Sequence, residues 1–150
     1  LQSLPLERCA GLPLVVIDLP LRAPAPYGFG PADFAGVDVM GAAVIMRTGW
    51  SSHWGTPSYF ENTHPFLSAE GTDFLVDHGA VLVGIDSLNI DCTVGRERPA
   101  HTGLLAHSIA IVEHLTNLHE LPPRGAQFTA VPVKIAGLGT FPVRAFATIG

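Results

Sequence analysis

Three short apolar runs, each about as long as a buried strand, set the strongest limit on how this chain folds. They are Leu14–Leu19, Val39–Met46 and Val81–Asp86, and proline, glycine or polar residues lie close to their ends. Continuous apolar runs of this length, rich in β-branched residues, predict strands that are buried on both faces, as in a parallel sheet.

A short helix is predicted between the second and third runs. Ser68 has the residue type of an N-cap, Phe74 lies on the apolar side, and Gly79 follows the last helical position. The order strand, strand, helix, strand favours an α/β fold over an all-β sandwich. Val131–Ala136 and Val143–Ile149 are predicted to be two further strands.

The composition is that of one apolar domain, residues 1–150. Charged residues make up 14% of the positions and hydrophobic residues 47%, whereas about 25% charged residues is usual. This excludes a disordered chain and predicts apolar surface that contacts either another chain or a missing segment of the same protein. We expect a homo-oligomer. A net charge of -5, no cluster of basic residues and no run of 18 apolar residues disfavour nucleic acid and membranes as partners.

The two cysteines, Cys9 and Cys92, lack the spacing of a zinc ribbon or a redox pair, and two are too few for a disulfide framework. We interpret them as reduced thiols and expect a cytoplasmic protein. The sequence starts Leu-Gln-Ser, with neither an initiating methionine nor a secretory leader. We interpret it as a piece of a longer protein.

Polar residues follow the third apolar run. Asp86 closes this run and Asp91 comes five positions later, and the carboxyl end of a strand is where sites usually lie in an open α/β sheet. His101 and Glu113 come next along the chain. Imidazole with carboxylate is a common ligand combination for zinc, manganese or iron, so these residues predict a metal site.

Whether His101 and Glu113 share one ion depends on the path between them. Twelve residues of unbroken helix span about 18 Å, which is too far. The sequence favours a break, because Thr102–His107 suits two helical turns and Ile109–Leu115 carries the β-branched residues of a strand. A chain that turns back in this way places Glu113 beside His101. The alternatives are that His101 is a structural, hydrogen-bonded histidine and that Glu113 is exposed or buried with a partner.

Several motifs, in their order and spacing, resemble the cyclase family of metal-dependent hydrolases, which includes bacterial kynurenine formamidase and isatin hydrolase. The matching features are Arg47-Thr48-Gly49-Trp50, His64-Pro65, Val83-Gly84-Ile85-Asp86-Ser87 with Asp91, His101 with Leu104-Leu105, Glu113, Pro132 and Pro142-Val143-Arg144-Ala145. The resemblance runs from about Leu6 to the end. It implies a swivelling β/β/α domain with a mixed sheet whose N-terminal part is missing from these 150 residues.

The resemblance also implies an activity: hydrolysis of an amide or ester, of the formamide or cyclic amide and lactone type, by a metal-activated water acting on a small-molecule substrate. His101 and Glu113 correspond to ligands of the second metal position, with zinc favoured over manganese. Asp86 and Asp91 are then expected to orient these ligands from behind. Three aromatic residues have two equally supported interpretations: they line the substrate pocket, or they serve core packing or a dimer contact. They are Trp50, Trp54 and Tyr59.

One part of the family pattern is absent. The segment His-x-Gly-Thr-His-x-Asp-x-Pro-x-His, which supplies the first metal's ligands and the acid or base, does not occur here, so no residue is assigned as catalytic. Three hypotheses follow: a hydrolase represented without this segment, a catalytically inactive scaffold or assembly subunit of the same fold, and a metal-free binding domain that uses residues 50–66 as a lid.

Overall fold

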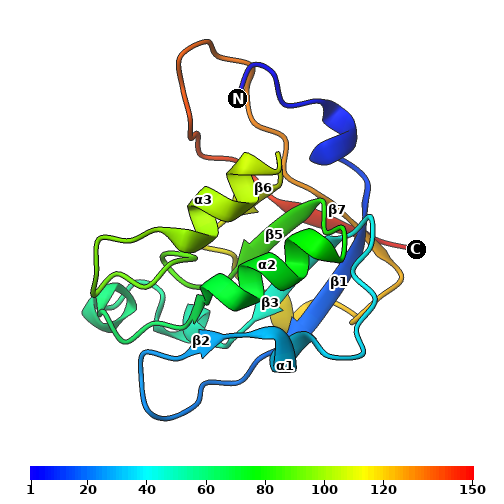
Figure 1. Ribbon diagram of the computed structural model, residues 1–150. Helices are drawn as coiled ribbons and strands as arrows, with labels where there is room; N and C mark the ends of the chain where they lie inside the picture. Colours follow the sequence, from blue (N-terminus) through cyan, green and yellow to red (C-terminus); the bar gives the residue numbers. More distant parts are fainter.

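A six-stranded mixed sheet organises the computed structural model, which describes residues 1–150 (Figure 1). The strand order is β6-β5-β3-β1-β7-β8. The strands β1, β3, β5 and β6 are parallel to one another, and β7 and β8 continue the sheet in antiparallel fashion. Their bounds are β1 Leu12–Asp18, β3 Ala43–Arg47, β5 Leu82–Ile85, β6 Ala110–Val112, β7 Ala126–Thr129 and β8 Phe146–Ile149.

Helices α1 (Pro31–Phe34), α2 (Ala69–Asp77) and α3 (Pro99–Ala106) pack over one face of the parallel strands (Figure 1). A separate parallel pair, β2 (Gly28–Phe29) with β4 (Phe66–Leu67), lies beside them. Four short 3-10 helices lie in the connections: η1 Leu6–Arg8, η2 Trp50–His53, η3 Pro57–Phe60 and η4 Leu118–Glu120. No helix is long and apolar enough to cross a membrane.

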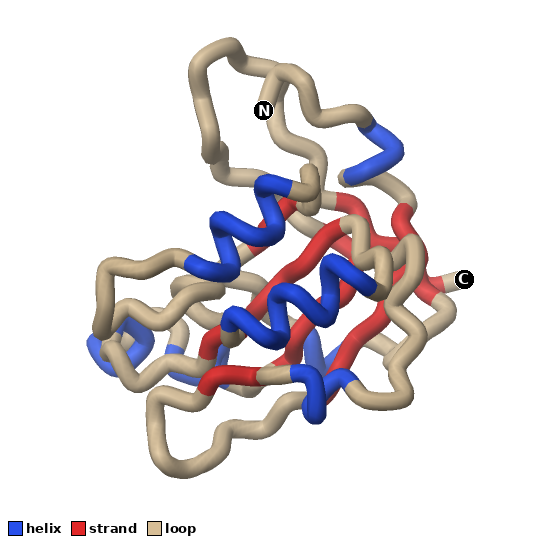
Figure 2. The backbone as a smooth tube through the Cα atoms, in the orientation of Figure 1, coloured by secondary structure: helices blue, strands red, loops and turns tan.

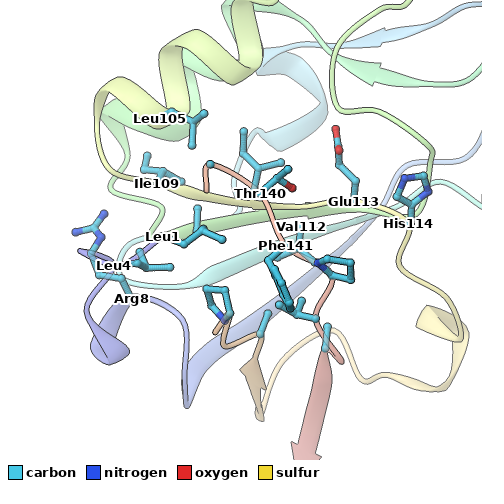
Figure 3. Close-up of a pocket in the computed structure, with 18 of the residues that line it drawn as sticks. Leu1, Leu4, Arg8, Leu105, Ile109, Val112, Glu113, His114, Thr140 and Phe141 are labelled. Carbon is cyan, nitrogen blue, oxygen red and sulfur yellow. The ribbon is translucent and has the colours of Figure 1, made fainter. Parts of the chain in front are cut away.

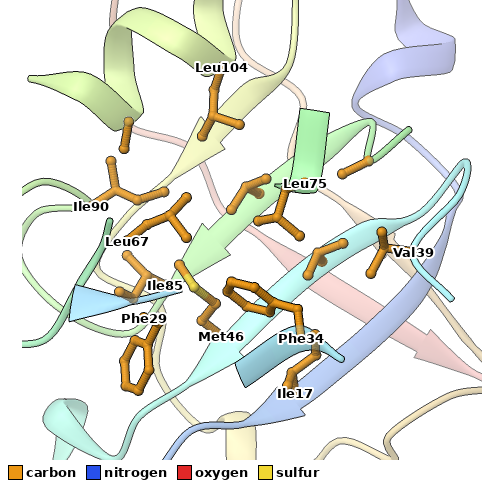
Figure 4. Close-up of a cluster of buried hydrophobic side chains, with 14 of the residues drawn as sticks. Ile17, Phe29, Phe34, Val39, Met46, Leu67, Leu75, Ile85, Ile90 and Leu104 are labelled. Carbon is orange, nitrogen blue, oxygen red and sulfur yellow. The ribbon is translucent and has the colours of Figure 1, made fainter. Parts of the chain in front are cut away.

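Alternate side chains of the strands fill two separate cores. The larger core lies between the sheet and the helices and contains Met46, Ile85, Leu75 and Leu104 among its buried residues (Figure 4). The other core covers the opposite face, where Leu118 and residues of β7 close it. Because both faces are covered, the parallel strands are apolar without interruption, as the sequence predicted.

Helix α2 follows directly from its sequence. Ser68 is its N-cap, and the backbone N–H of Gly71 donates to the Ser68 hydroxyl at 3.1 Å. Gly71 also lets α2 approach β2 closely, because a Cβ there would lie 2.3 Å from the carbonyl oxygen of Phe29. After the helix, Gly79 adopts a φ of 77°, a left-handed conformation that ends the helix.

The predicted fold class is confirmed, and so are the strands near residues 14–19, 39–46 and 81–86. The second begins only at Ala43, because Val39–Ala42 forms a turn, closed by a hydrogen bond from the N–H of Ala42 to the carbonyl of Val39, with Gly41 at a φ of 69°. The prediction of a strand over Val131–Ala136 is wrong: this segment has no strand pairing, and Pro132 lacks an N–H to donate. Within Val143–Ile149 only β8 is a strand.

Candidate functional site

The carboxyl ends of β5 and β6 and the first turn of α3 bring three predicted site residues together. Asp91 lies in the connection from β5 to α3, His101 lies in the first turn of α3, and Glu113 directly follows β6. Since α3 ends at Ala106 and β6 turns back beside β5, the helix break expected between residues 101 and 113 is present.

Asp91 holds His101 in place. This carboxylate is fully buried and accepts hydrogen bonds from the backbone N–H groups of Ala100 at 2.7 Å and His101 at 3.1 Å, so it caps α3. Its Oδ2 also accepts from His101 Nδ1 at 2.6 Å. Burial alone would raise the pKa of Asp91, but the hydrogen bonds from His101 and Ala100 outweigh it and leave this pKa lowered. The same hydrogen bond raises the pKa of His101.

Glu113 faces the other nitrogen of the same ring. Glu113 Oε1 accepts from the backbone N–H of Ile90 at 2.7 Å and lies 3.7 Å from His101 Nε2. That separation is too long for a hydrogen bond. Because Nδ1 donates to Asp91, the neutral ring carries its lone pair on Nε2, directed to the side where the Glu113 carboxylate lies.

This pair has the chemistry of metal ligands. Two ligands that each lie about 2.0–2.2 Å from one zinc ion are at most about 4 Å apart, so the 3.7 Å between His101 Nε2 and Glu113 Oε1 leaves room for a shared cation. A histidine held from behind by a carboxylate is the usual arrangement around such an ion. The 150 residues contain no cluster of three or more histidine, cysteine or acidic side chains that could hold a metal.

Asp86 lies at the end of β5 but serves the neighbouring loop. Its carboxylate accepts from the backbone N–H and the hydroxyl of Thr48, at 3.0 and 2.6 Å, and from the backbone N–H of Gly49 at 2.8 Å. These contacts hold the loop after β3, in which Gly49 has a φ of 84°. Asp86 forms no hydrogen bond or ion pair with His101 or Glu113, so of the two aspartates only Asp91 orients the imidazole.

A cavity of about 1110 Å³ opens beside His101 and Glu113 (Figure 3). Its floor is β6 with the residues that follow it, and its walls are the N-terminal segment from Leu1 to Arg8 and residues 139–145. Figure 2 shows both walls as mainly loop, standing beyond the sheet. Half of the lining residues are hydrophobic, and the polar ones include His101, Glu113 and His114.

The three predicted rings have different positions. Trp54 is 55% exposed and lines the cavity. Trp50 and Tyr59 are buried and do not line it, and the indole N–H of Trp50 donates to the carbonyl of Tyr59 at 3.0 Å. Tyr59 instead supports the cavity from behind, because its ring meets that of Trp54 edge to face with centroids 4.9 Å apart.

Sequence reasoning missed His114. It lines the cavity next to Glu113, and its Nδ1 lies 3.0 Å from the Tyr59 hydroxyl. Burial, aided by the carboxylates of Asp86 and Glu113, raises the pKa of Tyr59 to about 12, so its phenol keeps its proton. No sequence signal identifies this pair, since 55 positions separate its members.

Solved structures of similar proteins share this architecture. Isatin hydrolase A from Labrenzia aggregata has a TM-score of 0.87 and 28% identity, with 99% of this chain and 64% of that chain covered. An isatin hydrolase bound to the product analogue thioisatinate has a TM-score of 0.85 and 26% identity, with 97% of this chain and 62% of that chain covered. A potential metal-dependent hydrolase with cyclase activity has a TM-score of 0.79 and 26% identity, with 97% of this chain and 68% of that chain covered. The chain therefore has the fold of these hydrolases.

Sequence comparison gives the family. A model described as putative cyclase matches residues 1–92, more than half of the chain, and the chain belongs to this cyclase family. An uncharacterized protein of Methanocaldococcus jannaschii is 33% identical over 109 residues, which cover 71% of this chain and 53% of that protein. The chain thus spans about half the length of this curated relative.

Proposed function

We propose that these 150 residues are part of a metal-dependent hydrolase that cleaves an amide or ester bond in a small molecule, of the formamide or cyclic amide and lactone type. The observation that carries the proposal is the arrangement of Asp91, His101 and Glu113, in which an oriented imidazole nitrogen and a carboxylate oxygen lie 3.7 Å apart at the edge of a cavity. The similar structures are those of a potential metal-dependent hydrolase and of isatin hydrolases, which supports the same class.

His101 and Glu113 would hold the divalent cation, for which we favour zinc over manganese because imidazole and carboxylate oxygen are both ordinary zinc ligands. Such an ion supplies Lewis acidity, which makes water a nucleophile near neutral pH and polarises a carbonyl oxygen. Asp91 keeps the proton of His101 on Nδ1 and thereby keeps Nε2 available. The N–H of Ile90 fixes Glu113 Oε1 on the facing side.

The cavity suits an organic substrate with one polar end. Its apolar side chains, with the exposed ring of Trp54, would take up the hydrocarbon part, while His101 and Glu113 lie at the polar end. Apolar walls around a few polar groups are typical of small-molecule sites. The buried rings of Trp50 and Tyr59 would support this wall without touching the substrate.

Two protein ligands are one fewer than a catalytic zinc ion usually has. We therefore propose that the domain is incomplete in these 150 residues and that the remaining ligands come from the rest of the full-length protein. The chain's coverage of 53% of its curated relative and 62–68% of the three similar structures described above supports this.

The decisive experiment is hydrolysis by the full-length protein. A panel of an aryl formamide, isatin and an aromatic lactone is assayed with added zinc or manganese and after chelation. We expect turnover of at least one substrate that depends on the metal. His101→Ala and Glu113→Gln should lower kcat/KM by more than the roughly 10- to 100-fold typical of an outer-shell partner.

The chain offers a matched control. His119 and Glu120 form another histidine and glutamate pair, 3.9 Å apart, but both side chains are exposed on η4. His119→Ala and Glu120→Gln should leave kcat/KM within twofold or so, as surface changes usually do. A full-length protein that binds the metal yet cleaves none of the panel would favour the inactive scaffold, for which the shortage of ligands in this chain is the supporting observation.

A further inference from the structure

One ring nitrogen of His114 has a hydrogen-bond partner within the chain, and the other has none. Nδ1 lies 3.0 Å from the hydroxyl of Tyr59, and Nε2 has no hydrogen-bond partner in the chain. The residue is exposed and lines the cavity beside Glu113 (Figure 3). The free nitrogen is therefore the polar atom that His114 can offer to a ligand.

The surroundings of Tyr59 decide which tautomer His114 adopts. Tyr59 is 1% exposed, and its hydroxyl has no hydrogen-bond partner other than His114 Nδ1. If Nδ1 carried the proton, the Tyr59 O–H would be left buried without an acceptor, which costs free energy. The hydroxyl therefore donates to Nδ1, and His114 carries its proton on Nε2.

The backbone explains how two successive side chains line the same cavity. In an extended segment neighbouring side chains point to opposite sides. His114 instead has a φ of 61°, a left-handed conformation that is uncommon outside glycine and in which asparagine, aspartate and histidine are enriched. Hydrogen bonds from the N–H of His114 to Ser87, at 3.0 Å, and from the N–H of Leu115 to Ile85, at 3.2 Å, hold this turn against the end of β5.

Ring contacts complete the arrangement. Trp54 lies edge to face with His114, with centroids 6.0 Å apart, and with Tyr59. The exposed indole and the imidazole thus form one aromatic wall. Two donors of that wall have no partner in the chain, the indole N–H of Trp54 and His114 Nε2, and His114 is the one that directly follows Glu113.

We infer that His114 is a substrate-binding residue: its Nε2–H donates to the carbonyl oxygen of an aromatic amide or ester that packs on Trp54, and Tyr59 is the positioning residue that fixes this tautomer. This deepens the proposed function and rests on it for the ligand class. It assigns to His114 a role separate from the His101 and Glu113 pair.

The tautomer is tested first, on full-length protein freed of metal and labelled with ¹⁵N in its histidine rings. The ring-nitrogen spectrum should show Nδ1 of His114 without a proton and Nε2 with one. Tyr59→Phe, which removes only the hydroxyl, should convert this into a mixture of tautomers. A proton on Nδ1 in the wild-type protein would overturn the inference.

The ligand class is tested by titrating two probes into the same metal-free protein, where no turnover occurs. Formanilide carries an aromatic ring and a carbonyl oxygen, whereas aniline lacks the carbonyl. His114→Gly suits the left-handed backbone and should weaken formanilide binding about 2- to 12-fold, the range for one net hydrogen bond, while aniline binding stays within twofold.

Two results of the titration would contradict the role of His114, and a third would overturn the ligand class. Equal losses for the two probes, or no loss for formanilide, would show that His114 does not donate to the carbonyl oxygen. Failure of the wild-type protein to bind formanilide would overturn the ligand class. Because no metal is present, a dependence of formanilide binding on His114 would stand even if the full-length protein hydrolysed nothing, so the two proposals fail separately.

Discussion

At the scale of single residues, Asp91 does more for the candidate site than any other side chain. It is fully buried, it caps α3 through two backbone N–H groups, and it holds Nδ1 of His101. A carboxylate accepts all three hydrogen bonds at once because it has only acceptor atoms. The start of the helix and the orientation of the imidazole therefore depend on one group.

We predict that Asp91→Asn weakens zinc binding by the full-length protein about 10- to 100-fold. Asparagine keeps one oxygen for the N–H of Ala100, but an NH2 group replaces the oxygen that faces His101. The imidazole proton then moves to Nε2, which loses the lone pair that binds a metal. A competition titration with a chelator of known affinity measures the change.

Asp18→Asn is the control for this substitution, because Asp18 is exposed and pairs with Arg47 away from His101. It should leave zinc affinity unchanged. Thermal unfolding of both variants shows whether Asp91→Asn acts through folding instead. Unchanged zinc affinity in a folded Asp91→Asn protein would contradict the role given to Asp91.

A second residue-scale prediction concerns His64, which is fully buried. Its Nδ1 donates to the carbonyl of Pro65, and its Nε2 contacts the Thr93 hydroxyl, both at 3.0 Å. Burial lowers the pKa of His64 below its usual value of 6.5. As pH falls below about 6.5, His64 therefore binds a proton in the unfolded chain but not in the folded protein, and the free energy of unfolding falls.

Replacement of His64 by glutamine removes this proton uptake. We expect the wild-type free energy of unfolding to fall more steeply than that of His64→Gln between about pH 7.5 and 5.5, with the difference in slope at most about 1.4 kcal/mol per pH unit. Urea unfolding at three pH values across this window measures both slopes. Parallel slopes would mean that His64 takes up its proton equally well in the folded state.

At the scale of the elements, close packing of α2 depends on a glycine. A Cβ at Gly71 would lie 2.3 Å from the Phe29 carbonyl oxygen and 2.9 Å from a methyl group of Leu67. The first contact is with backbone, so it is relieved only if α2 or β2 moves. We predict that Gly71→Ala destabilises the protein by about 1–3 kcal/mol, measured by urea unfolding, although alanine favours helices.

Gly139→Ala is the matched control, since nothing lies within 4 Å of a Cβ at that position. It should change the free energy of unfolding by less than about 0.5 kcal/mol in the destabilising direction. If the two substitutions had the same effect, the close approach of α2 to β2 would not be the cause.

The elements also show what the sequence can predict. β1, β3 and β5 lie in the three continuous apolar runs, and α2 has its cap at Ser68, so local residues determine them. β7 and residues 131–136 both alternate apolar and other side chains, yet only β7 pairs, between β1 and β8. That choice depends on which strands are adjacent in space, which no local pattern contains.

Part of the candidate site could likewise be predicted from the sequence, and part could not. The helix-length argument placed Glu113 beside His101, because it needed only the rise per residue of a helix and a break. The roles of Asp86 and Asp91 were not separable from the sequence, since both follow β5, and only the structure shows that Asp91 turns to His101. The His114 contact depends on a backbone angle and a distant tyrosine, so it was out of reach.

At the scale of the whole molecule, the parallel strands place the candidate ligands at one corner of the sheet. β6 is an edge strand, so the residues after it lie beside the cavity and not beneath another strand. Two loop walls from opposite ends of the chain, the N-terminal segment up to Arg8 and residues 139–145, line the same cavity. The corner is open enough for a ligand and for further protein groups.

The last prediction follows from counting ligands over the whole chain. His101 and Glu113 are two protein ligands, no cluster of three such side chains exists in these residues, and a tight catalytic zinc site usually has three. We therefore expect calorimetry to show weak zinc binding by the 150-residue chain and much tighter binding by the full-length protein. His101→Ala should abolish the weak binding, whereas His119→Ala should preserve it. Tight binding of one zinc ion per 150-residue chain would contradict the proposal, because the site would then be complete without any further segment.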